Sequence, residues 1–126
     1  SAFESAHDLM NYGEGLQRIF FISLLFSSAE NGVVLIDEFE NAIHTDLISK
    51  FAPFIHKLAV EFNVQVFLTT HSKECIDSFV KKIPDTNDFS YHALVRHGEK
   101  IESREFSGKE YYKLVKAGNI DLRKAQ

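Results

Sequence analysis

The 126-residue sequence has few of the residues that mark several classes of protein. Its one cysteine, Cys75, excludes an internal disulfide and a cysteine-rich zinc site. Two prolines and six glycines argue against a disordered or low-complexity chain. No stretch approaches the ~20 apolar residues of a membrane span, and no charged-then-apolar segment opens the chain. We therefore expect a globular, cytoplasmic protein with no membrane partner.

Charge and aromatic content narrow the class further. With 14 Lys+Arg against 18 Asp+Glu, the net charge of −4 gives no overall nucleic-acid footprint, although a local basic patch stays possible. Twelve phenylalanines and no tryptophan predict a Phe-rich core. Five lysines of the second half are interpreted as lying on solvent-exposed surface, and the alternative is a local contact with DNA or a partner. They are Lys81, Lys82, Lys109, Lys113 and Lys116.

The hydrophobic pattern of the first half predicts an α/β fold. Gly15–Ser28 is apolar on nearly every side, which is typical of a helix buried on more than one face. Val33–Ile36 is apolar without alternation, as in a central parallel strand covered on both faces. A helix is predicted over 46–62, in which Pro53 indicates either a kink or a late helix start. With a strand over 64–68, it completes one right-handed βαβ unit.

The second half predicts shorter elements. Ser72 is a suitable N-cap for a helix over 72–80. Two strand candidates, 89–95 and 101–106, form a hairpin. Ser107 and Glu110 have the spacing of a capping box, which begins a last helix that ends near Gly118.

Two acids follow the first strand directly, and they are the strongest chemical signal. Ligands of open parallel sheets sit at the carboxyl ends of the strands. Asp37 is suited there to hold Mg²⁺ beside phosphates, and Glu38 to polarise a water for attack. The alternative is that both acids begin a surface loop and cap the next helix.

A histidine follows the second strand. Neighbouring parallel strands end at the same edge of a sheet, so His71 is expected near Asp37 and Glu38. A neutral histidine there could donate to a phosphate oxygen or bind the attacking water. The alternative is an ordinary loop histidine.

A glycine-containing turn precedes the first helix. Gly13, Glu14 and Gly15 would leave backbone N–H groups and the positive end of the helix dipole open to a phosphate. The alternative is a flexible helix start.

Taken together and in this order, these segments resemble the C-terminal lobe of an ABC-type ATPase head. Such heads occur in SMC, RecF and OLD-like P-loop NTPases, and the chain is most similar to the bacterial AAA-family ATP-binding proteins. The resemblance implies that Gly13, Glu14 and Gly15 stand in the signature loop. It puts Asp37 in the Walker B magnesium position and Glu38 in the catalytic-base position.

The resemblance also covers the loops that follow the two strands. It implies that Asn41 and His44 lie in the nucleotide-contacting D-loop, and that His71 is the catalytic switch histidine. Gly13 replaces the usual signature serine, and His44 replaces the usual D-loop aspartate.

A phosphate-binding loop is missing from this pattern. No Gly-x-x-x-x-Gly-Lys-Ser/Thr occurs in the sequence, so we expect this loop upstream of Ser1 and interpret residues 1–126 as part of a P-loop NTPase-like domain. The resemblance implies ATP and Mg²⁺ as cofactors and a homodimer that encloses ATP. It further implies coupling of hydrolysis to DNA or to an effector protein, in DNA repair or phage defence.

Two other functions fit the same residues. Asp37, Glu38 and Glu40 could form the metal site of a nuclease. The chain could also be a non-catalytic interaction module. If part of the sheet lies outside the chain, apolar surface is exposed, and we expect self-association.

Overall fold

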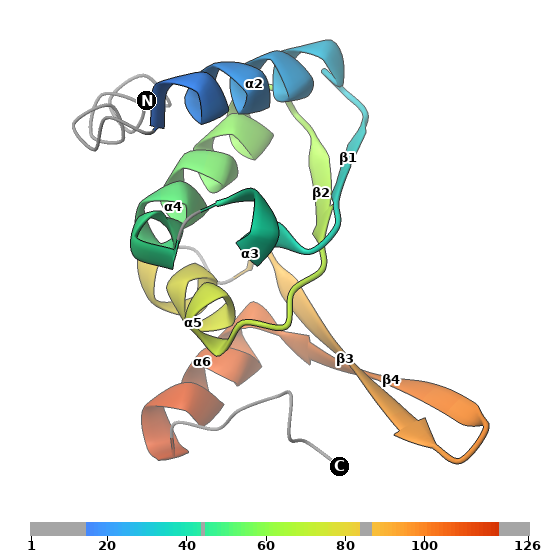
Figure 1. Cartoon of the computed structure of the whole chain (residues 1–126). Coiled ribbons are helices and arrows are strands. Elements are labelled where there is room, and N and C mark those ends of the chain that lie inside the picture. The colour runs from blue at the N-terminus through green and yellow to red at the C-terminus, as the bar shows by residue number, and fades with distance from the viewer. Residues whose placement is uncertain (1–14, 44, 84–86, 119–126) are drawn as a thin grey trace.

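The computed structural model describes residues 15–43, 45–83 and 87–118, and it shows a mixed α/β chain (Figure 1). The elements in the N-terminal half are α2 (Gly15–Ser28), β1 (Val33–Ile36), α3 (Phe39–Ala42), α4 (Thr45–Glu61) and β2 (Gln65–Leu68). Those in the C-terminal half are α5 (Lys73–Lys82), β3 (Ser90–His97), β4 (Lys100–Ser107) and α6 (Gly108–Gly118). The order matches the sequence prediction except for α3, which the sequence did not predict.

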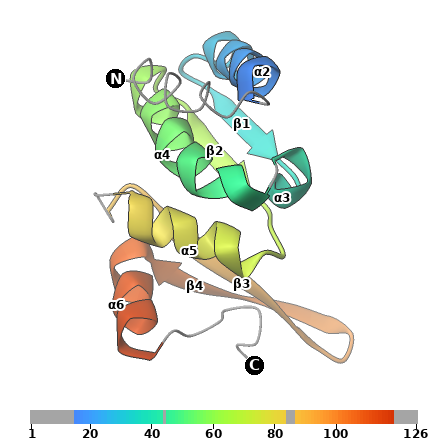
Figure 2. The ribbon, with the colours of Figure 1, turned by 60° about the vertical axis from the view of Figure 1, so that its left-hand side comes forward.

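A two-stranded parallel sheet organises the first half. β1 and β2 pair in parallel from Val33 opposite Gln65 to Ile36 opposite Leu68. α4 connects the two strands and runs beside the sheet (Figures 1 and 2). α2 lies across the end of the sheet at which β1 begins. The prediction of a parallel β-α-β arrangement is therefore confirmed.

The main core lies between this sheet and its helices. Apolar side chains from α2, β1, α3, α4 and α5 form one cluster, which includes Val34 of β1 and Cys75 of α5. Four phenylalanines in this cluster are almost completely buried: Phe26, Phe39, Phe51 and Phe54. The predicted Phe-rich core is thus present.

The expectation that β1 is covered on both faces is wrong for the described chain. Side chains of a strand alternate between its two faces, and only Val34 and Ile36 turn toward the core. Val33, Leu35 and Phe67 lie on the other face and are 53%, 75% and 53% exposed. We call these three side chains the open sheet face.

α2 is also buried on fewer sides than its sequence predicts. Ile19, Ile22 and Phe26 pack into the core, whereas Phe20 and Phe21 remain largely exposed. Nothing in the described chain packs against that second side of the helix. Within the described residues, the prediction of a helix buried on more than one face is therefore wrong.

Helix boundaries follow local signals closely. The Ser72 hydroxyl accepts a hydrogen bond from the Cys75 N–H at 3.2 Å, which confirms Ser72 as the N-cap of α5. α4 continues past Pro53, so this residue lies inside the helix and does not delay its start.

The second half is a β-hairpin covered by a helix. β3 and β4 pair antiparallel from Ser90–Ser107 to His97–Lys100. The capping box is confirmed, because Ser107 N–H donates to Glu110 Oε2 at 2.9 Å and Glu110 N–H donates to Ser107 Oγ at 3.2 Å. α5 lies between α4 and α6, and it shares a small second core with α6 made of Ile76, Val80, Tyr111 and Val115 (Figure 2).

None of the helices within the described ranges has both the length and the apolar character that a membrane crossing requires.

Candidate functional site

The candidate site lies at the carboxyl ends of β1 and β2. Because Ile36 pairs with Leu68, the residues that follow them, Asp37 and Thr69, leave the sheet side by side. The Thr69 hydroxyl donates a hydrogen bond to Asp37 Oδ1. The structure therefore brings the two polar segments to one edge, as the sequence predicts. We call this edge, from Asp37 to Asn41 and from Thr69 to His71, the carboxylate edge.

Glu38 has an unusual backbone conformation. Its φ of 50° and ψ of 59° are left-handed, a region that costs a non-glycine residue roughly 1–2 kcal/mol. Three hydrogen bonds hold the residue: its N–H donates to Thr69 Oγ1 at 2.8 Å, its carbonyl oxygen accepts from the Asn41 N–H at 2.9 Å, and its Oε2 accepts from Asn41 Nδ2 at 2.8 Å. The bond from Asn41 Nδ2 thus holds the Glu38 carboxylate at the start of α3.

Thr69 connects both acids. Its hydroxyl donates to Asp37 and accepts from the backbone of Glu38, so one side chain positions two candidate functional residues. The backbone adds a further link, since Phe39 N–H donates to the Thr69 carbonyl oxygen at 3.0 Å. No separate role was assigned to Thr69 from the sequence. A hydroxyl residue directly after β2 is nevertheless a usable signal once the two strands are known to pair.

Glu40 joins the loop after β1 to the loop after β2. Its Oε2 accepts from the Thr70 hydroxyl at 2.6 Å, and its Oε1 accepts from the His71 N–H at 2.8 Å. Desolvation by partial burial raises the pKa of Glu40, but these hydrogen bonds and the nearby His71 charge together outweigh it. The pKa of Glu40 therefore lies below its ordinary value.

His71 reaches the carboxylate edge through this contact with Glu40. The backbone N–H of His71 makes this contact, and the side chain of His71 is exposed. Asp37, Glu38 and Asn41 are exposed as well. The edge is thus an open, polar surface on which a ligand could contact several side chains.

The side chains of the carboxylate edge fit the kind of magnesium site in which the protein supplies only one or two carboxylates. Mg²⁺ in nucleotide sites is bound by one or two carboxylates, with phosphates and water completing its shell. An exposed Asp37 at the end of a strand suits that role. Within the described ranges, no three or more His, Cys, Asp or Glu side chains are grouped to hold a metal ion, and Glu40 is bonded to Thr70 and His71. The contacts of Glu40 therefore do not favour the nuclease alternative.

Some predicted site residues cannot be placed. Gly13, Glu14 and His44 lie outside the described residues. Gly15 is the first residue of α2, as expected for a turn that leads into this helix. The predicted phosphate contact at the helix start thus stays a prediction.

Comparison with known proteins assigns the family. Residues 2–77 match the model of a family described as "AAA domain, putative AbiEii toxin, Type IV TA system". The chain belongs to this AAA-domain family. The matched range contains β1, α4, β2 and the whole carboxylate edge, whereas the hairpin and α6 lie beyond it.

Two curated proteins are similar to this AAA-domain chain. The uncharacterized protein MJECL11 of Methanocaldococcus jannaschii is 33% identical over 112 residues, which cover 88% of this chain and 98% of that protein. An ATP/GTP phosphatase of Helicobacter pylori is 30% identical over 111 residues, which cover 80% of this chain. The chain spans only 30% of the length of the phosphatase. No solved structure matches the chain.

Proposed function

We propose that this chain is the part of an ATP-hydrolysing head that carries its magnesium-binding and catalytic acids. The observation that carries the proposal is the carboxylate edge, where Asp37 and Glu38 leave a parallel strand and both bond to Thr69. Membership of an AAA-domain family supports it, as does the similarity to a protein named an ATP/GTP phosphatase.

Each acid has a distinct role in this proposal. Asp37 holds Mg²⁺ beside the ATP phosphates, and the ion, when bound, neutralises their negative charge. Glu38 accepts a proton from the attacking water or orients it, and the Asn41 amide keeps its carboxylate in place. His71 contacts the γ-phosphate from the neighbouring loop.

The remaining predicted contacts complete the nucleotide site. Gly13, Glu14 and Gly15 contact the phosphates of ATP from the start of α2. Asn41 of α3 and His44, which follows α3 in the sequence, line the site. These five residues form the cofactor-binding set of the proposal.

The proposed arrangement is an ABC-type head that works as a homodimer, of which this chain forms the C-terminal lobe. The open sheet face supports this, because parallel sheets are normally covered on both faces and extended by further strands. A phosphate-binding loop is supplied by another segment or another chain. Hydrolysis opens the dimer and acts on DNA or an effector protein, in DNA repair or phage defence.

Substitution of Glu38 tests the proposal in the full-length protein. Glu38→Gln keeps the size of the side chain and its acceptor for Asn41, but it cannot take a proton. We expect phosphate release from Mg-ATP to fall about 100-fold or more while ATP binding is kept. Glu99→Gln, on the exposed hairpin turn, removes the same charge and is the matched control. Unchanged turnover in Glu38→Gln would show that Glu38 is not the base.

A further inference from the structure

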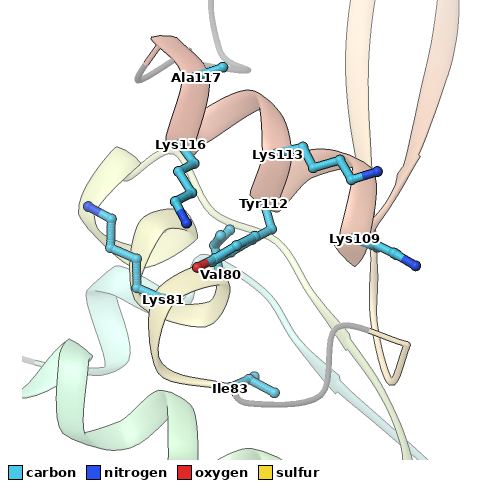
Figure 3. A pocket seen from close by; sticks show the side chains of 8 residues that line it. All are labelled: Val80, Lys81, Ile83, Lys109, Tyr112, Lys113, Lys116 and Ala117. Atoms are coloured by element: carbon cyan, nitrogen blue, oxygen red, sulfur yellow. The ribbon is translucent and has the colours of Figure 1, made fainter.

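A lysine-lined cleft lies between α5 and α6, separate from the carboxylate edge. Its volume is about 720 Å³. Val80 and Ile83, both buried, are among its lining residues, and none of the described residues that line it is acidic. Four lysines are among its lining residues, and Figure 3 shows Lys81 and Lys116 on one side of Tyr112 and Lys109 and Lys113 on the other.

One face of α6 supplies most of this cleft. Lys109, Tyr112, Lys113 and Lys116 follow one another at helical spacing, so they form a single stripe. The stripe is roughly 10 Å long, because a helix rises 1.5 Å per residue. The opposite face of α6 is buried through Tyr111 and Val115, so the lysine stripe faces outward.

Helix stability explains only part of this pattern. Lys116 lies in the last turn, where the helix dipole favours a positive charge, and Lys113 interacts electrostatically with the Glu110 carboxylate. Lys109 stands in the first turn of α6, where the helix dipole disfavours a positive charge. Lys109 and Lys113 are four residues apart, a spacing at which like charges repel. The only acid of α6, Glu110, accepts its hydrogen bonds from Ser107. An external anion would relieve this repulsion.

Tyr112 adds an aromatic surface between the cations. Its side chain is part of the cleft and is 39% exposed, and Lys116 Nζ lies 5.9 Å from the centre of its ring. Figure 3 shows the ring between the lysines of α6 and the end of α5. Proteins that bind single strands combine such a cationic groove with aromatic rings on which bases stack.

We propose that this cleft binds the phosphodiester backbone of single-stranded nucleic acid, with one base stacked on Tyr112. The net charge of −4 favours a local contact of this kind over binding across the whole surface. The cleft residues lie beyond the range matched by the family model. The proposal goes beyond ATP hydrolysis and does not depend on it.

Fluorescence anisotropy tests the proposal, with labelled 12-nucleotide thymidine and uridine oligomers titrated without ATP at several salt concentrations. The test variant changes three cleft lysines to glutamine: Lys109, Lys113 and Lys116. The charge-matched control changes three exposed basic residues of other elements to glutamine: Lys50, Lys100 and Arg104. Circular dichroism first confirms that both variants are folded.

We expect only the cleft variant to lose affinity for the single-stranded oligomers. Log-log plots of affinity against salt for single strands have a slope of about −0.7 per neutralised phosphate, so removing three lysines should make the slope shallower by about 2. Affinity should fall at least tenfold at low salt, and the control variant should bind nearly as the unchanged chain does. Binding of either sugar backbone supports the proposal, because the phosphodiester is common to both. Equal losses in the two variants would overturn it.

Tyr112 distinguishes a single strand from other polyanions. Tyr112→Ala should weaken binding roughly tenfold, while Tyr112→Phe should keep it, because stacking needs only the ring. If polyaspartate or a DNA duplex competes as well as the single strand at equal charge, the cleft takes another polyanion and the proposal is wrong.

Discussion

Glu40 connects the loops after β1 and β2 through two hydrogen bonds, which we call the Glu40 bridge. Replacing Glu40 gives a quantitative test of how the carboxylate edge is held together. In Glu40→Gln, the side chain keeps its size but loses its charge and one of its two acceptor oxygens. The one amide oxygen can accept from only one of the two donors, the Thr70 hydroxyl and the His71 N–H, and that bond becomes neutral. The amide nitrogen can keep a contact with Thr70 only by donating to its hydroxyl oxygen, which is again a neutral bond. The two loops after β1 and β2 should separate more easily.

The magnitude follows from these two contacts. A hydrogen bond to a charged group contributes about 1.5–3 kcal/mol to stability and a neutral one about 1 kcal/mol. Because the loops are partly exposed, we take the low end and expect Glu40→Gln to lower the free energy of unfolding by about 1–2 kcal/mol. For a chain of this size, that corresponds to a fall in Tm of about 4–8 °C.

The stability that the Glu40 contacts contribute should depend on pH. The pKa of folded Glu40 lies below its ordinary value of 4.5, so its charged contacts stabilise the fold above that pH. The stabilisation is lost as the pH falls through the folded pKa. The difference in the free energy of unfolding between the unchanged chain and Glu40→Gln should therefore be largest at pH 7. It should shrink as the pH falls below about 4.5.

Urea unfolding at pH 7 and at pH 3.5, followed by circular dichroism, measures both effects. Glu99→Gln again serves as the control, because its side chain is exposed at the hairpin turn. A Glu40→Gln chain as stable as the control at pH 7 would refute the bridge. A loss of the same size at both pH values would refute its dependence on charge.

Four further results are expected. Phe54→Ala empties a fully enclosed site in the core and should cost about 3–5 kcal/mol of unfolding free energy by urea titration. Ser107→Ala removes one half of the capping box and should cost about 1 kcal/mol, with the loss confined to α6 in hydrogen exchange. Burial raises the pKa of the Cys75 thiol to about 11, so at pH 8 it should react with Ellman's reagent only as fast as the chain unfolds. Self-association through the open sheet face should be lost in the double variant Leu35→Ser and Phe67→Ser, and light scattering should then give the mass of one chain.

Signals that act within a few residues were read correctly from the sequence. Ser72 caps α5 because its hydroxyl reaches the N–H three residues later, and Ser107 and Glu110 form their box by the same local geometry. The strand Val33–Ile36 was bounded by Gly32 and Asp37, and its limits are those predicted. Such features depend on the neighbours in sequence, which the sequence itself contains.

Several features that depend on distant partners were missed, although the parallel pairing of β1 with β2 was predicted. An apolar run such as Val33 to Ile36 has the same pattern whether one face or both are covered. The sequence therefore did not identify Leu35 as exposed, although it predicted exposed apolar surface if part of the sheet lies outside the chain. α3 follows a left-handed Glu38 whose N–H is bonded to a side chain 31 residues away. The roles of Thr69 and Glu40 likewise became visible only with the strand register, because their partners belong to the other strand's loop.

The separation of Asp37 and Thr69 along the chain has a consequence for biosynthesis. The two residues are 32 positions apart, so the acids are made before the hydroxyl that positions them. At ribosomal rates of about 5–20 residues per second, this interval lasts roughly two to six seconds. The left-handed turn at Glu38 lacks its bond to Thr69 during that time. The carboxylate edge therefore assembles only after β2 has been synthesised, and a nascent chain that ends before Thr69 should carry the acids without their geometry.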